Sequence, residues 1–223
     1  MRRIVVIALS VMLALVAAIP IASGKPALTA KKPSQTLGEL GADWWKWALQ
    51  KPEHINPLVG SYSGGPKCQG QRGGVFFLAG TINGESVTRE CTVSSNTWIF
   101  FPIVNNFQGE PKGTGSEEEF RQFVNNCMDQ ALVGSTTFAT LDGTPISTQE
   151  RADTPLFNLT LPGPNIFGAP PGRYQAVADG VWVLLPPLTE GTHTITFGGD
   201  FPNNPAECGG PFSQNNTYIL TVK

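Results

Sequence analysis

The sequence predicts a mainly β protein, an antiparallel β-sandwich of the jelly-roll or immunoglobulin-like kind with two short helices. Three observations predict this class. Glycine and proline are frequent, at 25 and 19 residues, while only 14% of the 223 residues are charged, a composition typical of many turns and few long exposed helices. Eight short runs rich in β-branched and aromatic residues alternate with turn signals. Only two stretches show helical periodicity.

The first 24 residues have the order of a secretory signal peptide. Arg2 and Arg3 precede an apolar run, 4–18, that only Ser10 interrupts, and small residues lead to Gly24. The run is too short and wrongly flanked for a membrane span. We expect Sec-type export with cleavage near Gly24, so that residues 25–223 are secreted or periplasmic. An uncleaved N-terminal anchor is the alternative.

Two helices are expected, over 36–50 and 116–131. The first carries apolar residues at helical spacing and ends before Pro52. The second begins with capping-box spacing between Ser116 and Glu119. Its single apolar stripe consists of Phe120, Phe123, Val124, Cys127, Met128 and Ala131.

The strands follow as short runs separated by turns. Asn83-Gly84 is a hairpin signal that predicts pairing of its two flanking strands, and Pro102 indicates an edge or a bulge. Asp142-Gly143 and Gly198-Gly199 are expected to be turns. Residues 108–115 are expected to be a loop. The predicted strands cover 75–79, 86–93, 98–104, 136–141, 156–161, 181–185, 192–197 and 217–222. We expect one domain over 25–223, and a division into two would fall near Gly134.

Four cysteines predict two disulfides in an exported chain, with three possible pairings. We favour Cys68–Cys91, which would tie a loop to a strand, and Cys127–Cys208, which would pin the second helix to the last long loop. No pair has the C-x-x-C spacing of a zinc site, so we expect no metal bound by these residues.

Charge argues against some partners. Removal of residues 1–24 leaves 13 basic and 17 acidic residues, a net charge of −4. Nucleic-acid binding calls for clustered basic charge, so no nucleic acid is expected. No second apolar run is long enough for a transmembrane segment in the mature chain.

Several strings together resemble a group of exported bacterial proteins of uncharacterised function. The likeness extends from about Gly38 to Val222. It implies bacterial secretion and a β-rich extracellular domain, and it implies no activity or catalytic residue. The strings are WWKWA at 44–48, FFLAG at 76–80, RECTV at 89–93, IFFPI at 99–103, and LLPPL at 184–188 with GTHTI at 191–195.

Aromatic residues carry the main binding hypothesis. Trp44, Trp47, Trp98 and Trp182 fall in apolar patterns and are expected in the core. Trp45 departs from the helical stripe, so with Tyr62 and Tyr174, which we expect in loops, it would offer a flat face to a sugar ring or a protein partner. We then expect Trp45→Ala to leave folding intact. The alternative is that Trp45 closes one end of the sandwich.

No catalytic motif stands out. His54 lies in a loop beside Glu53, and His193 lies within a strand; neither has a recognisable nucleophile, since G-x-S-x-G and H-E-x-x-H are absent from the sequence. A glycosidase needs two opposed carboxyls. The candidate acids are Glu117, Glu118, Glu119, Asp43, Asp179 and Asp200, and nothing pairs them. The sequence therefore favours a protein that is not an enzyme.

No cofactor is expected, and calcium is the one alternative. Its oxygen ligands would come from loops and strand ends, although these residues also serve ordinary turns. The candidates are Asn105, Asn106, Asp179, Asp200, Asn203 and Asn204. We expect a secreted or envelope-associated, non-catalytic binding module for a glycan or an envelope protein. The alternatives are an extracellular hydrolase with an unrecognised site and a structural surface subunit with a free edge strand.

Overall fold

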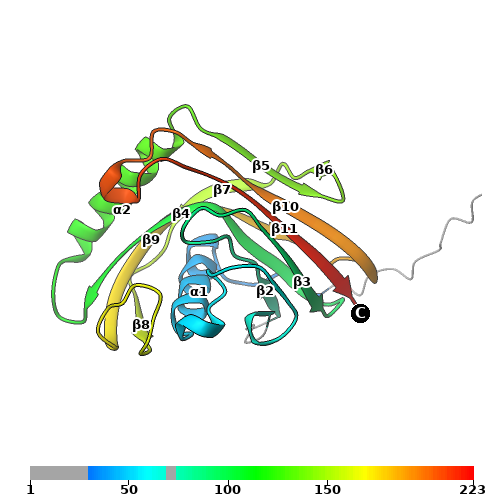
Figure 1. Cartoon of the computed structure of the whole chain (residues 1–223), viewed down its shortest axis with the longest axis horizontal. Helices are drawn as coiled ribbons and strands as arrows, with labels where there is room; N and C mark the ends of the chain where they lie inside the picture. Colours follow the sequence, from blue (N-terminus) through cyan, green and yellow to red (C-terminus); the bar gives the residue numbers. More distant parts are fainter. Residues whose placement is uncertain (1–29, 69–73) are drawn as a thin grey trace, which may run out of the picture.

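The computed structural model describes residues 30–68 and 74–223, so the predicted signal peptide lies outside the described residues. Two β-sheets pack face to face, and a helix covers the outer side of one of them (Figure 1). The prediction of a mainly β, sandwich-like protein with two helices is confirmed. The sheets are mixed rather than purely antiparallel, because three strand pairs are parallel: β1 with β3, β3 with β11, and β2 with β4.

The six-stranded sheet has the order β1-β3-β11-β10-β5-β6. Its strands are β1 (Tyr62–Ser63), β3 (Val87–Val93), β11 (Phe212–Val222), β10 (Gly191–Phe201), β5 (Thr136–Leu141) and β6 (Thr144–Pro145). The five-stranded sheet has the order β2-β4-β9-β7, with β8 also paired to β9. Its strands are β2 (Val75–Phe77), β4 (Trp98–Pro111), β9 (Gly172–Leu185), β7 (Gln149–Asp153) and β8 (Phe157–Leu161). Short 3₁₀ turns occupy Glu53–Ile55, Pro66–Cys68 and Ala206–Cys208.

The long strands β4 and β9 are the centre of the molecule, since alternate residues serve two cores. Phe101 and Val183 face the six-stranded sheet, whereas Phe100 and Trp182 face the first helix. Where β9 extends beyond the six-stranded sheet, Val177 packs against the second helix instead. One face of β4 and β9 is therefore covered partly by a sheet and partly by a helix.

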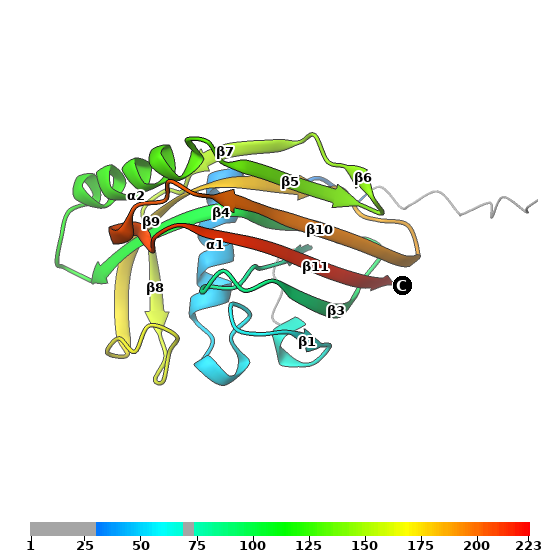
Figure 2. The same ribbon diagram turned by 45° about the horizontal axis from the view of Figure 1, so that its top comes forward.

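The first helix, α1 (Leu37–Leu49), begins with a Thr36–Glu39 capping box and lies on the outer face of the five-stranded sheet (Figure 2). A Cβ atom on Gly38 would lie 2.0 Å from the Asp153 carbonyl oxygen, so glycine permits the close contact between helix and strand. Trp44 and Trp47 are buried, as predicted.

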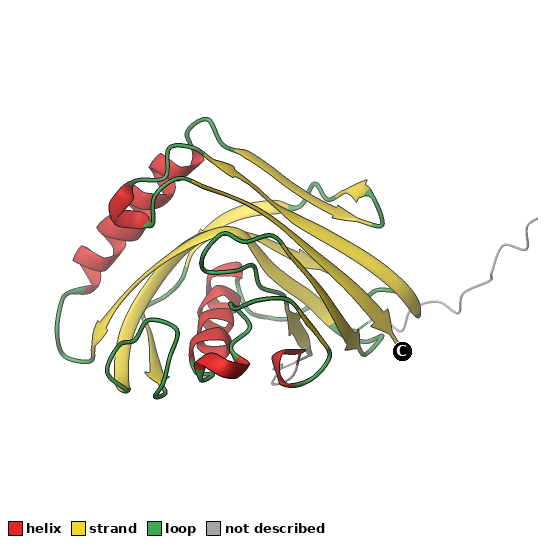
Figure 3. Ribbon diagram, viewed as in Figure 1, coloured by secondary structure: helices red, strands yellow, loops and turns green. Residues whose placement is uncertain are grey.

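The second helix, α2 (Glu117–Leu132), has the predicted Ser116–Glu119 capping box. It packs mainly against β9 and β4. The two long helices lie on opposite sides of the five-stranded sheet (Figure 3). The buried stripe of α2 consists of Phe120, Val124, Cys127, Met128 and Ala131. Phe123, which the sequence also placed in this stripe, is only partly buried.

Both favoured disulfides are present, Cys68–Cys91 and Cys127–Cys208. The first joins a loop to β3, and the second joins α2 to the loop before β11. Disulfides are typical of oxidising compartments. None of the helices within residues 30–68 and 74–223 is long and apolar enough to cross a membrane.

Several local predictions were wrong. The strands beside Asn83-Gly84 do not form a hairpin, because β2 joins β4 while β3 joins the other sheet. Gly198-Gly199 continues β10, where a Cβ on Gly198 would lie 2.0 Å from the Gln214 carbonyl oxygen. Residues 108–111 extend β4 rather than opening a loop. Pro102 does mark a bulge, as predicted, since the β4–β9 register shifts between Pro102 and Val104.

Candidate ligand-binding cleft

The site begins at an open edge of β4. On the side away from β9, β4 pairs only with β2, and that pairing ends at Phe77 opposite Phe100. After Phe100, no described strand pairs with this edge of β4. The chain leaves β2 and runs on through Gly80 to Gly84, so a space opens between this segment, β4 and the start of β11.

A cleft of about 380 Å³ occupies this space, a volume in the range of small-molecule sites. Its walls come from α1, from the 80–84 segment, from β4, and from the 204–214 stretch that leads into β11. None of the described side chains that line it carries a charge. The polar side chains are Thr81, Asn83, Asn105, Asn106, Asn204 and Gln214.

Three aromatic rings form a row from the interior of the cleft to its mouth. Trp45 is 6% exposed, and its ring centroid lies 4.8 Å from that of Phe107. Phe107 in turn stacks on Phe167, with centroids 6.2 Å apart and planes 6° from parallel. Phe167 is 43% exposed, and so is Ile82, another lining residue, at 49%. The lining of the cleft therefore combines exposed apolar side chains with side-chain amides.

Two hydrogen-bond donors at the cleft have no partner. Neither the indole Nε1 of Trp45 nor the amide Nδ2 of Asn105 has an acceptor among the described residues. Other indoles are satisfied: Trp44 Nε1 donates to the Leu78 carbonyl at 2.7 Å, and Trp182 Nε1 donates to the Ala152 carbonyl at 2.9 Å. An unsatisfied buried donor costs about 1–3 kcal/mol, which an acceptor on a ligand would recover.

One wall of the cleft is held by a disulfide. Cys208 and Asn204 both line the cleft. Cys208 is bonded to Cys127, a buried residue of α2. The Asn204 amide donates to the carbonyls of Cys208 and Gly210 at 3.1 and 2.7 Å. The 204–211 loop is thus fixed to α2 on one side and folded on itself on the other.

The structure does not bring the three predicted ligand-binding aromatics together. Trp45 lines the cleft, although it is a buried residue rather than an exposed platform. Tyr62 lies in β1, and its ring packs 4.7 Å from the guanidinium of the buried Arg89; burial raises the pKa of Tyr62 above its ordinary value. Tyr174 lies in β9, is 8% exposed and donates its hydroxyl to the Pro170 carbonyl. The expectation that the two tyrosines lie in loops was therefore wrong.

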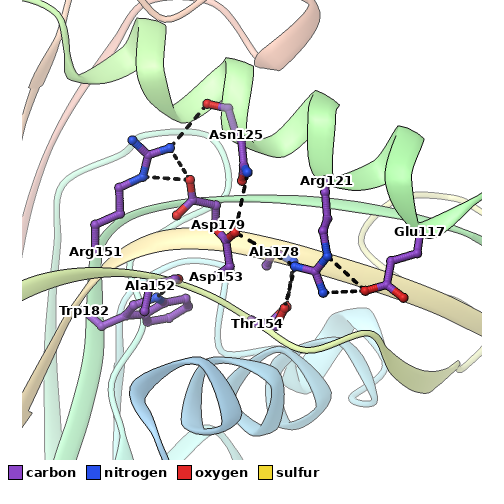
Figure 4. A network of polar contacts seen from close by, with 10 residues as sticks. All are labelled: Glu117, Arg121, Asn125, Arg151, Ala152, Asp153, Thr154, Ala178, Asp179 and Trp182. Carbon is purple, nitrogen blue, oxygen red and sulfur yellow. Dashed lines mark hydrogen bonds and ion pairs between the residues drawn. The ribbon is translucent and has the colours of Figure 1, made fainter.

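A second polar region lies on the opposite margin of the same sheet, beneath α2 (Figure 4). Arg151 of β7 donates to Asp179, which is fully buried, and to the exposed Asp129 at 2.6 Å. Asn125 donates to Asp153 at 3.5 Å. Burial raises the pKa of Asp179 above its ordinary value, against the opposing effect of Arg151. This region pairs its charges internally, although Asp179 Oδ1 has no partner among the described residues.

The histidines do not form a recognisable catalytic site. His193 Nδ1 contacts Asp142 Oδ2 at 2.7 Å, and its Nε2 contacts the Thr189 carbonyl at 2.9 Å and the Thr189 hydroxyl at 3.3 Å. Both ring nitrogens are thus engaged by groups of the same chain. His54 is exposed in a 3₁₀ turn. Neither histidine lines the cleft.

The carboxylate and calcium candidates are dispersed. Glu119 serves the α2 capping box, and Glu117 pairs with Arg121 at 2.6 Å. Asn203 donates to the Val133 carbonyl at 2.8 Å. Within the described part of the chain, no group of three or more His, Cys, Asp or Glu side chains could hold a metal. Asn105, Asn106 and Asn204 line the cleft, where their amides face a neutral surrounding.

Comparison with models of known protein families gives no match for this chain, and no curated protein matches its sequence.

Sequence reasoning missed the aromatic row beyond Trp45. Phe107 follows the polar pair Asn105-Asn106, which reads as the end of a strand, yet β4 continues to Pro111. Phe167 lies between β8 and β9, and only the fold brings it onto Phe107. The available signal was the spacing of Asn105 and Phe107, because residues two apart in a strand lie on the same face.

Proposed function

We propose that this chain is an exported, non-catalytic binding module whose cleft holds a neutral saccharide. The observation that carries the proposal is the lining of the cleft: aromatic rings and side-chain amides with no charged group. Sugar rings present apolar C–H faces and uncharged hydroxyls, and rings such as Phe167 and amides such as Asn105 complement both. Sec-type cleavage near Gly24 and a bacterial, secreted or periplasmic setting form part of the proposal, supported by the signal-like residues 1–24 and the two disulfides.

Calorimetric titration with neutral oligosaccharides tests the proposal. Phe167→Ala should weaken binding about fivefold, since a lost ring contact is worth roughly 1 kcal/mol. Leu156→Ala is the matched control, because Leu156 is similarly exposed at 40% and lies away from the cleft. A neutral ligand should also bind equally at low and high salt. Saccharide binding that survives Phe167→Ala unchanged, or no binding by any neutral saccharide, would count against the proposal.

The open edge of β4 favours a second candidate, the structural subunit. An extended segment of a partner protein would add to this edge through main-chain hydrogen bonds. Three features work against it: Pro102 has no N–H to donate, the bulge breaks the register, and the Gln214 amide already donates to the Ile103 carbonyl at 3.5 Å. A strand-forming peptide that binds saturably would favour this candidate instead, provided that binding is lost when the peptide carries a proline at the position opposite Val104.

A further inference from the structure

The two unpartnered groups in the cleft are both donors. Trp45 offers one N–H and Asn105 offers an NH₂, and neither finds an acceptor among the described residues. The donors lie on neighbouring elements, because the ring of Trp45 packs on Phe107 and Asn105 lies two residues from Phe107 on the same face of β4. The complementary ligand group is an acceptor with two lone pairs and no hydrogen atom that would itself need an acceptor.

A carbonyl oxygen meets this description better than a hydroxyl does. A hydroxyl brings a donor of its own, which would need an acceptor in return. Apolar surface lies close to the donors: Trp44 and Leu58 line the same cleft, and both are buried. A carbonyl that bears a methyl group would satisfy the donors and cover this surface at once.

We infer that the cleft selects saccharides that carry an acetamido group, such as an N-acetylhexosamine. The inference rests on the proposed function and names the ligand class for the same site. The acetamido oxygen accepts from Trp45 Nε1 and Asn105 Nδ2, and its methyl group packs on the apolar wall. The absence of charge from the described lining excludes a preference for acidic sugars. Both donor nitrogens are covered in this conformation, so binding includes a local rearrangement that exposes them.

The test compares two ligands that differ at one position of each ring. Full-length mature protein is titrated with the β-1,4-linked trimer of N-acetylglucosamine and with the corresponding trimer of glucose. We expect the acetylated trimer to bind at least about tenfold more tightly. A ligand that leaves the polar groups of a site unpaired loses much of its affinity. Equal affinities would overturn the inference and leave the proposed function standing. Binding of neither trimer would overturn the inference, and failure across other neutral saccharides would remove the proposed function too.

Variants of the donors separate recognition from folding. Asn105→Leu keeps the volume and removes the unpaired donor, so its melting temperature should equal or exceed that of the parent, while selectivity for the acetylated trimer falls toward unity. Trp45→Phe should reduce selectivity as well, because it removes the indole N–H and keeps a ring. Asn158→Leu, an exposed position on β8, is the control and should change neither quantity. Undiminished selectivity in Asn105→Leu, or a marked loss of its stability, would contradict the inference.

Discussion

Two polar regions lie on opposite margins of the five-stranded sheet, and they differ in what their hydrogen bonds do. Along β7 and β9, beneath α2, charged groups are paired with one another, as in the Arg151–Asp179 contact. Along the open edge of β4, the polar groups are neutral amides and an indole, and two of their donors have no partner. The margin beneath α2 also leaves two buried acceptors unpaired, Asn125 Oδ1 and Asp179 Oδ1. The two margins therefore differ in kind: unpaired acceptors lie beside charged pairs in one, and unpaired donors lie in an uncharged cleft in the other.

This difference is the basis for proposing a binding site at one margin and a structural network at the other. Buried charges are retained when they are paired, and removal of one partner is costly. Buried donors without acceptors lower the stability of the fold, because they lose their hydrogen bonds to water and gain none within the chain. The Cys127–Cys208 disulfide connects the two margins, because it joins α2 to the wall of the cleft.

The largest expected effect comes from cutting that connection. The Cys127–Cys208 bridge spans 81 residues and the Cys68–Cys91 bridge spans 23, so the chain-entropy model predicts losses of about 4 and about 3 kcal/mol. Cys127→Ser/Cys208→Ser should also weaken saccharide binding, because the cleft wall loosens. Cys68→Ser/Cys91→Ser should leave affinity unchanged. Equal saccharide affinities in the two double variants, measured below their melting temperatures, would show that the Cys127–Cys208 disulfide does not support the cleft.

Trp45→Ala is expected to lower the free energy of unfolding by about 4 kcal/mol, as for other buried tryptophans. This corrects the sequence-based expectation that the substitution leaves folding intact, since Trp45 belongs to the core beneath the cleft. Phe167→Ala, at the exposed end of the same aromatic row, should cost less than about 1 kcal/mol. Denaturant unfolding of both variants checks the contrast, and similar losses would remove the distinction between the two ends.

Arg151→Ala tests the charged margin. It leaves Asp179 buried and unpaired, and a loss of about 3 kcal/mol is expected at neutral pH. Because burial raises the pKa of Asp179, the folded state binds a proton more readily than the unfolded chain, so this loss should shrink as pH falls toward about 4. Asp129→Asn, at an exposed partner of the same arginine, should cost less than about 1 kcal/mol. A loss in Arg151→Ala that grows on acidification would contradict this account.

The smallest effect is expected at Asp142, outside both margins. Burial raises the pKa of its carboxyl, but hydrogen bonds from the Thr194 N–H and from His193 outweigh this and hold the pKa below its ordinary value. Its contribution to stability is therefore present above about pH 4 and is lost as pH falls through the lowered pKa. Asp142→Asn keeps the left-handed turn and should remove this pH dependence, shifting the melting temperature by no more than about 2 °C. An unchanged pH profile would contradict the assignment.

Much of the fold could be predicted because its signals are local. The Ser116–Glu119 box fixes the start of α2, and alternating residues define β8 and β11. Strand partners were not predictable in the same way. Asn83-Gly84 has the composition of a hairpin turn, yet β2 pairs with β4 in one sheet and β3 pairs with β11 in the other, and the two strands face one another across the same core. Local turn chemistry does not report on that choice.

The site was predictable only in part. Departure from the helical stripe predicted an exposed Trp45, but the ring is buried in the core, where it packs on Phe107, and Phe107 in turn stacks on Phe167 from a distant segment. Tyr62 is held beside Arg89 by a contact between separate strands. An unpartnered donor is a property of the folded surroundings, so no sequence pattern could reveal the Asn105 amide as one.

The measurement that tests the central claim most directly follows the tryptophan indole N–H signals by NMR during titration with a neutral oligosaccharide. Trp44, Trp98 and Trp182 donate to carbonyls within the chain, whereas Trp45 does not. We predict that the Trp45 signal shifts in a saturable way while those of Trp98 and Trp182 stay in place. Saturable binding that leaves the Trp45 signal unmoved would contradict the assignment of the cleft as the binding site.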